Sequence, residues 1–418
     1  MTTATPPDLD RRNRRFGIFA LVLAAIAGAV FATGTAGVAT TFQLNDVFGE
    51  PAYATLPAVV VPVAPTALFL ALVIAGVGLY QAVRGFGDRA TIVISVLLGL
   101  FVLAFLVWAA RGQQLQVLAL LRGTMRAAVP LALGALSGVL CERAGVINIA
   151  IEGQFLAAAF TAALVSSATG SPWLGLVGGI LAGGLVGALL AVLSIRYRAD
   201  QIVVGVVLIV LATGVTSFLT SQLLVPNPGL NAPDRFGAVT VPVLGDIPLI
   251  GPLLFRHSVT VYLMLLAVVV VQIALFRTRW GLRLRAVGEH PKAADTVGIR
   301  VLATRYRAVI LGGMVAGIGG AYFTLDAAGQ FSREMSGGRG FIALAAMLVG
   351  RYSPAGALGA ALIFGFADAL STSLQILNVG IPSTLLLTAP YVVTILVVAG
   401  LVGRLRMPAA DGQPYVKE

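Results

Sequence analysis

The chain has 418 residues, of which 58% are hydrophobic and only 11% are charged, and its formal net charge is +11. Soluble domains carry about 25% charged residues, so the composition excludes a water-soluble globular protein and indicates a chain that crosses a bilayer many times. The positive residues are nearly all arginines between apolar runs, which indicates membrane topology and argues against nucleic-acid binding. The single cysteine, Cys141, excludes an intrachain disulfide and a cysteine-based zinc site.

Apolar runs predict an all-α, polytopic bundle of transmembrane helices, because a spanning helix needs about 20 mostly apolar residues. The first run follows four arginines and lacks a convincing cleavage site, so we expect a retained span rather than a signal peptide. The run at 338–350 is short and is expected to be tilted, re-entrant or half-spanning. About twelve spans (ten to fourteen) are predicted, at 16–36, 57–80, 90–110, 123–140, 149–168, 173–194, 201–223, 258–277, 307–324, 338–350, 353–373 and 383–403.

The chain is expected to divide into a tail at 1–15, an additional block of about three spans at 16–122, a core at 123–403 and a second tail at 404–418. The longest loop of the core, 277–307, holds eight basic residues against two acidic ones. Cytoplasmic loops carry the excess of Lys and Arg, so this loop and both termini are expected in the cytoplasm. The arginines that oppose this assignment are Arg111, Arg122, Arg126, Arg333 and Arg339.

Glycines repeat every four residues in two of the predicted spans. Such stripes of small residues let two helix backbones approach closely, so we interpret both as packing faces. The members are Gly175, Gly179, Gly183 and Gly187 in one span and Gly313 and Gly317 in the other.

Polar residues gather at 142–154, where two apolar runs meet almost without a polar spacer. Glu152 and Gln154 lie inside the second run, and a charge at membrane depth is costly unless it faces a partner or a watery cavity. Glycines in the segment would permit an irregular backbone, which is tolerated there only when buried in protein or lining a cavity. The segment therefore favours a gate or cavity that includes Asn148. The alternative is a cytoplasmic turn whose first two residues, an acid and an arginine, pair in solvent.

A short helix is predicted within the basic loop, at 281–298. Pro291 suits the first turn of a helix, Ala293 and Ala294 are good helix formers, and Gly298 suits a helix end. Such a helix could dock a soluble partner. The residues alone allow equally well an ordinary basic loop at the lipid headgroups.

Asp368 lies about two-thirds of the way along a predicted span. It could line a translocation path or hydrogen-bond to a neighbouring helix, and no Arg or Lys within the membrane is evidently placed to meet it.

Motifs of catalysis and ATP binding are missing from the sequence. It contains no Gly-x-x-x-x-Gly-Lys-[Ser/Thr] loop, so we expect that the chain does not bind ATP itself. The two histidines, His257 and His290, fall on opposite predicted sides of the membrane and form no metal-binding pair. Neither a Ser-His-Asp set nor paired carboxylates converge on one loop. We therefore expect a protein that is not an enzyme and that holds no metal or cofactor.

Three segments in order resemble the permease subunits of ATP-binding-cassette (ABC) importers for nucleosides, simple sugars and branched-chain amino acids. The resemblance covers 124–403. Asn148-Ile-Ala-Ile-Glu152-Gly153 is similar to the Asn-Ile-Gly-x-Glu-Gly pattern of the nucleoside branch, with Ala150 where glycine is usual. The three segments are Glu142-Arg-Ala-Gly-Val-Ile-Asn-Ile-Ala-Ile-Glu-Gly-Gln154, Arg285-Ala-Val-Gly-Glu-His-Pro-Lys-Ala-Ala-Asp-Thr-Val-Gly-Ile299, and Gly337-Gly-Arg-Gly-Phe-Ile-Ala-Leu-Ala-Ala continuing to Phe364-Gly-Phe-Ala-Asp368.

The resemblance implies a pore subunit of the bacterial inner membrane that crosses the membrane many times. A separate ATPase subunit would bind ATP and receive residues 289–298, the coupling helix, in a groove. A second, similar permease chain would complete the pore as a heterodimer, and a surface lipoprotein would deliver the solute. Asn148, Glu152, Gln154 and Asp368 would form the gate or the solute path. The residues expected in the coupling loop are Gly288, Glu289, Pro291, Ala293, Ala294, Asp295 and Gly298.

The best interpretation is an importer permease for a nucleoside. A simple-sugar permease of the same family is the first alternative. A self-contained secondary transporter is the second alternative. It would need ion-coupling acids deep in the spans, and Glu152 and Asp368 alone give little support for this. A membrane-embedded enzyme would need a polar catalytic loop, which the sequence does not reveal.

Overall fold

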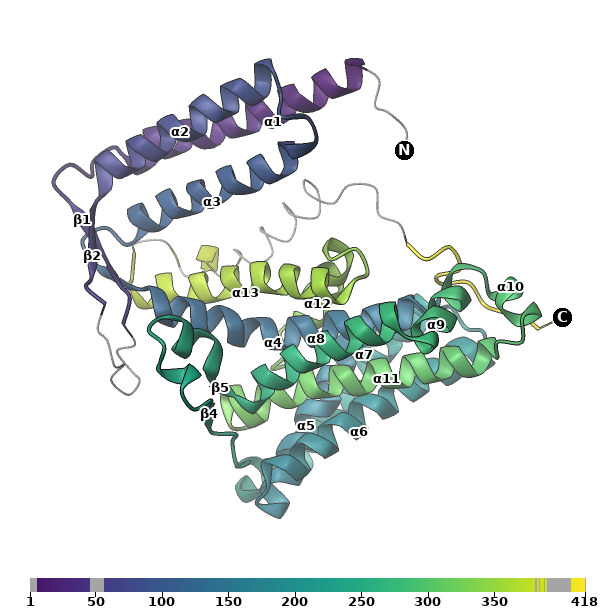
Figure 1. The fold of residues 1–418 in the computed structure, drawn as a ribbon. Helices are drawn as coiled ribbons and strands as arrows, with labels where there is room; N and C mark the ends of the chain where they lie inside the picture. The colour runs from purple at the N-terminus through teal and green to yellow at the C-terminus, as the bar shows by residue number, and fades with distance from the viewer. Residues whose placement is uncertain are drawn as a thin grey trace. The chain divides into compact units, whose positions relative to one another are not determined.

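The computed structural model describes residues 6–45, 56–379, 382, 384–386, 388 and 407–417. Helices dominate these residues, and only short strands accompany them (Figure 1). The helices are α1 (Pro6–Ile26), α2 (Val63–Val83), α3 (Ala90–Ala109), α4 (Val117–Glu142), α5 (Ile151–Thr169), α6 (Pro172–Ala191), α7 (Gln201–Leu219), α8 (Val259–Arg277), α9 (Arg279–Glu289), α10 (Pro291–Thr296), α11 (Val301–Tyr322), α12 (Arg339–Val349) and α13 (Pro354–Ile376).

Ten helices of the described chain are long and apolar enough to cross a membrane. They coincide with ten of the twelve predicted spans, so the prediction of a polytopic helix bundle is confirmed. The run at 338–350 forms α12, which at 11 residues is too short to span a bilayer alone. The run at 383–403 lies largely outside the described residues, as do Arg404 and Arg406 of the second tail. The cytoplasmic placement of the two termini stays a prediction.

One compact unit consists of Met1–Leu120, Asp246–Leu249 and Leu370–Leu386. Within it α1 and α2 run side by side (Figure 1), and Ala20 and Ala24 of α1 are buried in a cluster with Ile74 of α2. Three strands form a small sheet of order β2-β1-β3: β1 (Ala39–Gln43), β2 (Val59–Pro62) and β3 (Gln114–Gln116). The strands were not predicted, because runs of three to five residues carry little periodic signal.

The second unit consists of Leu121–Gly245, Ile250–Ala369 and Leu387–Glu418. Most of α4 is buried within it, whereas α7 exposes Val203, Val207 and Val210. An apolar face outside the protein core suits contact with lipid tails, so α4 is a central helix and α7 a peripheral one. A two-stranded antiparallel pair, β4 (Ala238–Thr240) and β5 (Arg256–Ser258), lies between α7 and α8 in the chain.

The glycine stripes lie where α6 and α11 pack against each other. Helices α5, α6 and α11 run side by side (Figure 1). A Cβ atom on Gly183 would stand only 2.7 Å from the Cα of Gly317, so the two backbones are in direct contact. The interpretation of both stripes as packing faces is therefore confirmed.

Candidate functional site

The polar segment at 142–154 forms the turn between α4 and α5. The side chain of Asn148 donates a hydrogen bond from Nδ2 to Ser137 Oγ at 3.0 Å and exchanges longer contacts of 3.3 and 3.4 Å with the amide of Gln154. All three side chains are fully buried, so the polar network is enclosed by protein and fixes the turn. The structure thus brings Asn148 and Gln154 together, and it adds Ser137, which was not predicted. Their role as a gate stays a prediction.

Glu152 binds the start of α12. Its Oε1 accepts hydrogen bonds from Ser336 Oγ (2.6 Å) and from the N–H of Gly338 (2.8 Å), and its Oε2 accepts one from the N–H of Gly340 (2.6 Å). The first N–H groups of a helix lack partners within the helix, and a carboxylate beside them is stabilised by the helix dipole. Glu152 therefore caps a short helix that lies about 180 residues away in the sequence.

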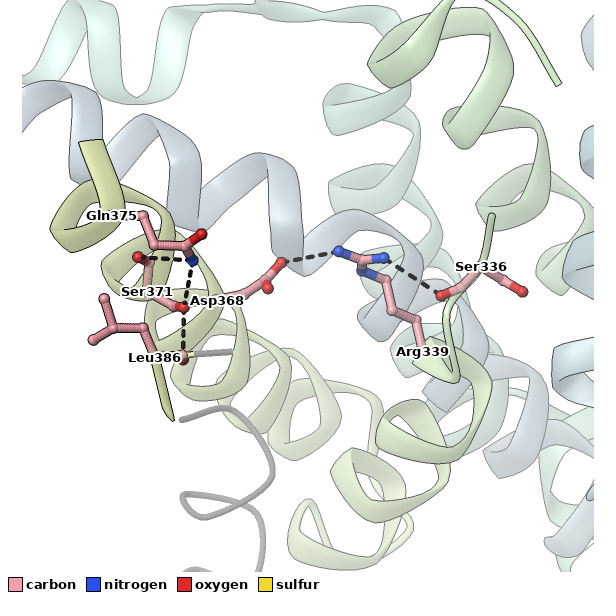
Figure 2. A network of polar contacts seen from close by, with 6 residues as sticks. All are labelled: Ser336, Arg339, Asp368, Ser371, Gln375 and Leu386. Carbon is pink, nitrogen blue, oxygen red and sulfur yellow. Dashed lines mark hydrogen bonds and ion pairs between the residues drawn. The ribbon is translucent and has the colours of Figure 1, made fainter. Parts of the chain in front are cut away.

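Asp368 pairs with Arg339, contrary to the expectation that it had no basic partner within the membrane. Arg339 Nη2 lies 3.3 Å from Asp368 Oδ2 (Figure 2), and both side chains are about one-third exposed, at 33% and 35%. The guanidinium also donates to the carbonyl oxygen of Ser336 at 3.4 Å. The pair links α13 to the first residue of α12, and it explains why an arginine stands there against the charge rule.

The last turns of α13 carry a second polar cluster (Figure 2). Ser371 Oγ donates a hydrogen bond of 2.6 Å to the carbonyl oxygen of Leu386, and Gln375 Nε2 donates one of 3.3 Å to the carbonyl oxygen of Ser371. The first bond ties the end of α13 to the chain that follows it, and the second lies within the helix.

The short helix predicted in the basic loop is present as α10. It begins at Pro291, and Gly298 beyond its end has a φ of +83°, which suits glycine. Ala294 is buried, whereas Lys292 and Ala293 are exposed. The helix therefore keeps one face free, and its role in docking a partner stays a prediction.

The end of α9 packs directly on the turn after α4. A Cβ atom on Gly288 would come within 2.9 Å of the carbonyl carbon of Arg143, so only glycine permits this approach. Arg143 in turn donates from Nε to the carbonyl oxygen of Tyr352 at 3.0 Å, in the turn between α12 and α13. Two segments that are distant in the sequence, 142–154 and 281–298, thus meet in space.

Residues 407–417, the C-terminal strap, lie against the same place. The N–H of Ala410 donates to the carbonyl oxygen of Gly288 at 2.9 Å. Buried Arg305 of α11 donates from Nη1 to the carbonyl oxygen of Gln413 at 2.8 Å. The strap is therefore bonded to both α9 and α11.

Both acidic residues of the loop at 277–307 contact the strap. Glu289 Oε2 accepts a hydrogen bond of 3.2 Å from the N–H of Ala409. Asp295 Oδ1 lies 4.0 Å from Lys417 Nζ. These contacts were not predicted, because the strap has no motif that marks it.

Asp411 of the strap lies beside Glu142 and Arg305. Burial raises the pKa of Asp411 to about 6, while contacts with Glu142, the N–H of Gly412 and Arg305 act in the opposite direction. The other ionisable groups around this pair of carboxyls are Cys141, Tyr352 and Tyr415. Because the two carboxyls interact, they titrate as a pair.

The strap is expected to bind more tightly at acid pH. The pKa of Asp411 rises from 3.8 to about 6 when the strap is docked, so protonation favours docking. This stabilisation is fully present below about pH 4 and is lost as the pH rises through about 6. A spin label on Val416→Cys should be more mobile at pH 7.5 than at pH 4.5, and Asp411→Asn should remove most of that difference. If the spin label has the same mobility at both pH values in the chain that keeps Asp411, the prediction is wrong.

Among the described residues, no group of three or more His, Cys, Asp and Glu side chains could hold a metal ion. What the structure does assemble is a polar turn, a capped short helix carrying an ion pair, and a helix of a basic loop packed on that turn. Together with ten apolar spans among the described residues, these features define a multi-pass membrane protein with polar groups buried between its helices.

The family model described as "Branched-chain amino acid transport system / permease component" matches residues 120–402. The chain belongs to this family, and the resemblance found in the sequence is confirmed.

Several curated proteins are similar to the chain over most of their own length. The guanosine ABC transporter permease protein NupQ of Bacillus subtilis is 43% identical over 305 residues, which cover 70% of this chain and 95% of NupQ. The nucleoside ABC transporter permease protein NupC of Lactococcus lactis is 39% identical, with coverage of 69% and 93%. The putative glucose ABC transporter permease protein TsgC13 of Haloferax volcanii is 36% identical, with coverage of 72% and 98%. No solved structure matches the chain.

The chain is therefore an ABC transporter permease and a multi-pass protein of the bacterial inner membrane.

Proposed function

We propose that the chain forms one half of the translocation pore of an ATP-driven importer, and that the imported solute is a nucleoside. A separate ATPase subunit binds ATP and docks on the loop at 277–307. A second permease chain completes the pore as a heterodimer, and an external lipoprotein delivers the solute. The chain itself catalyses no reaction and binds no cofactor. Support for the solute comes from the guanosine and nucleoside permeases that align over 70% and 69% of the chain.

Both termini lie in the cytoplasm in this proposal. The C-terminal strap is bonded to α9 and α11, so the strap and the basic loop lie on one side of the membrane. The positive-inside rule places such a loop in the cytoplasm, where an ATPase subunit can reach it.

A continuous series of contacts from α10 into the spans carries the proposal. The end of α9, next to α10, packs on Arg143. The turn that follows leads through the Asn148 network into α5, where Glu152 binds the start of α12. The first residue of α12 is Arg339, which pairs with Asp368. Packed and hydrogen-bonded elements of this kind can transmit a displacement of α10 to the ion pair.

The ion pair has suitable chemistry for a nucleoside path. The carboxylate of Asp368 accepts hydrogen bonds such as those of ribose hydroxyls, and the guanidinium of Arg339 donates them. The Arg339 guanidinium also lies 5.9 Å from the ring centroid of the buried Phe323, a contact that helps to hold the guanidinium in place. Each member of the pair is partly exposed, at 33% and 35%, so both can reach a solute.

A simple-sugar importer of the same family is the second candidate. It is favoured by the putative glucose permease, which is 36% identical over 98% of its own length. A sugar would use the same hydroxyl contacts with the ion pair. Competition between nucleosides and glucose for uptake separates the two candidates.

Uptake into proteoliposomes tests the proposal. Vesicles that hold this chain, a second permease and the ATPase should transport labelled guanosine only under two conditions. ATP must be supplied on the cytoplasmic side of the membrane, and the binding protein on the opposite side. The matched control is a Gly288→Val chain, in which the contact with Arg143 is sterically blocked. Uptake by this chain alone, driven by an ion gradient, would refute the proposal in favour of a secondary transporter.

A further inference from the structure

The exposed side of α10 is too small to dock a partner by itself. The helix has six residues, whereas stable protein–protein interfaces bury roughly 1,200–2,000 Å² in total. Adjacent surface must therefore contribute. An open cleft of about 490 Å³ lies beside α10, lined by residues 289–292 on one side and by Ala409, Ala410 and residues 413–416 of the C-terminal strap on the other. Figure 1 shows the strap, in yellow, beside α9 and α10.

The strap and α10 form one packed body. The ring of Tyr415 is buried in an apolar cluster with Val287 of α9, Ala294 of α10 and Val301 of α11. Because Tyr415 covers the buried face of α10, a displacement of the helix also displaces the docked strap.

Around the strap and α10, three basic side chains (Lys292, Arg300 and Lys417) stand against two acidic ones (Glu289 and Asp295). The acidic groups of Glu289 and Asp295 are engaged by the strap, through the N–H of Ala409 and through Lys417. Lys292 and Arg300 remain exposed around them. A partner that binds here would present acidic side chains, since complementary charges guide association.

Apolar side chains are exposed on the same surface. Val297, just after α10, is 75% exposed, and Val416 of the strap is 47% exposed. Both lie outside the spans, so the hydrocarbon of the bilayer does not cover them. Exposed apolar groups with a polar rim are typical of protein interaction sites.

We propose that the C-terminal strap and α10 together form the docking surface for the ATPase subunit. Val297 and Val416 make apolar contacts with the partner, and Lys292 and Arg300 face its acidic side chains. The inference rests on the proposed function, in which an ATPase docks on α10, and it adds the strap as a direct contact.

Site-directed crosslinking tests the contact in the full complex of this chain, its second permease and the ATPase. The native cysteine, Cys141, is buried, so in this chain only the cysteines introduced at the surface should react with the crosslinker. Ala293→Cys on α10 and Val416→Cys on the strap should both crosslink to the ATPase. Tyr197→Cys, which lies on another loop and is 69% exposed, is the control and should not. If Ala293→Cys crosslinks and Val416→Cys does not, the strap proposal is wrong while the proposed function stands. If neither crosslinks, both are wrong.

An affinity measurement gives a second, independent result. Val416→Asp should weaken binding of the ATPase at least about tenfold, or about 1.4 kcal/mol, because it places an acid where the partner is apolar or acidic. Tyr197→Asp makes the same change of charge at an exposed site away from the cleft and should leave the affinity unchanged. Equal affinity of the Val416→Asp chain and the native chain would overturn the proposal. Since Val416 is exposed, the substitution should not disturb folding.

Discussion

Replacing Glu152 with alanine is expected to lower the apparent melting temperature of the purified chain by several degrees and to abolish uptake. The carboxylate accepts hydrogen bonds from two backbone N–H groups and from one hydroxyl group at the start of α12. Its removal leaves these donors without their partner in a buried place, at a cost of about 2–4 kcal/mol. No water can replace the side chain fully, because Gly340 lies against the backbone of Glu152.

We expect uptake to be abolished even though the melting temperature falls by only several degrees, because Glu152 also fixes the position of Arg339 at the start of α12. Glu152→Gln keeps the size of the side chain but turns one acceptor into a donor, so its effect should be intermediate. Glu334→Gln makes the same change at an exposed acid nearby and should alter the melting temperature little, as surface substitutions usually do. A Glu152→Ala chain with native thermal stability would show that the carboxylate is not the cap of α12.

The spans and α10 could be predicted because their signals are local. Long apolar runs define the spans, and a proline followed by two alanines and a glycine defines the short helix. Such signals depend on neighbouring residues only, so tertiary packing reinforces them rather than creating them.

Local sequence signals do not predict which residues the buried polar side chains contact. The charge of Glu152 is costly inside an apolar run, so the sequence predicts that this residue has a partner. The residues that bind it, however, lie about 180 positions later. The pairing therefore follows from how α5 and α12 pack, which one sequence does not reveal. A usable signal was present for Asp368: Arg339 violates the charge rule at the start of a short apolar run, and such an arginine within the membrane needs an acid.

The strap is the part of the site least visible in the sequence. Residues 407–417 have neither apolar periodicity nor charge excess, and they were expected only to form a cytoplasmic tail. Their importance comes from contacts with Gly288, Arg305 and the acids of the loop. The strap thereby links the loop at 277–307 to α11, and the end of α9 in this loop packs on the turn at 142–154.

Asp368→Asn is expected to reduce uptake at least about tenfold while changing the melting temperature little. A partly exposed ion pair contributes only about 0–1 kcal/mol to stability, and both members of this pair are about one-third exposed, at 33% and 35%. In the proposed function Asp368 contacts the solute, and asparagine presents a donor where aspartate presents only acceptors. Transport and thermal stability should therefore separate for this residue, in contrast to Glu152.

Exchanging the two charges decides between the two interpretations of Asp368. In the Asp368→Arg/Arg339→Asp chain the ion pair can re-form, so a purely structural pair predicts that uptake recovers relative to either single substitution. A solute path predicts no recovery, because acceptor and donor have changed places relative to the solute; the coupling between the sites is measured by the double-mutant cycle. Gln375→Ala, which removes hydrogen bonds from the last turns of the same helix, serves as the control and should retain uptake. Recovery of native uptake in the exchanged chain would show that Asp368 holds α12 and α13 together and does not meet the solute.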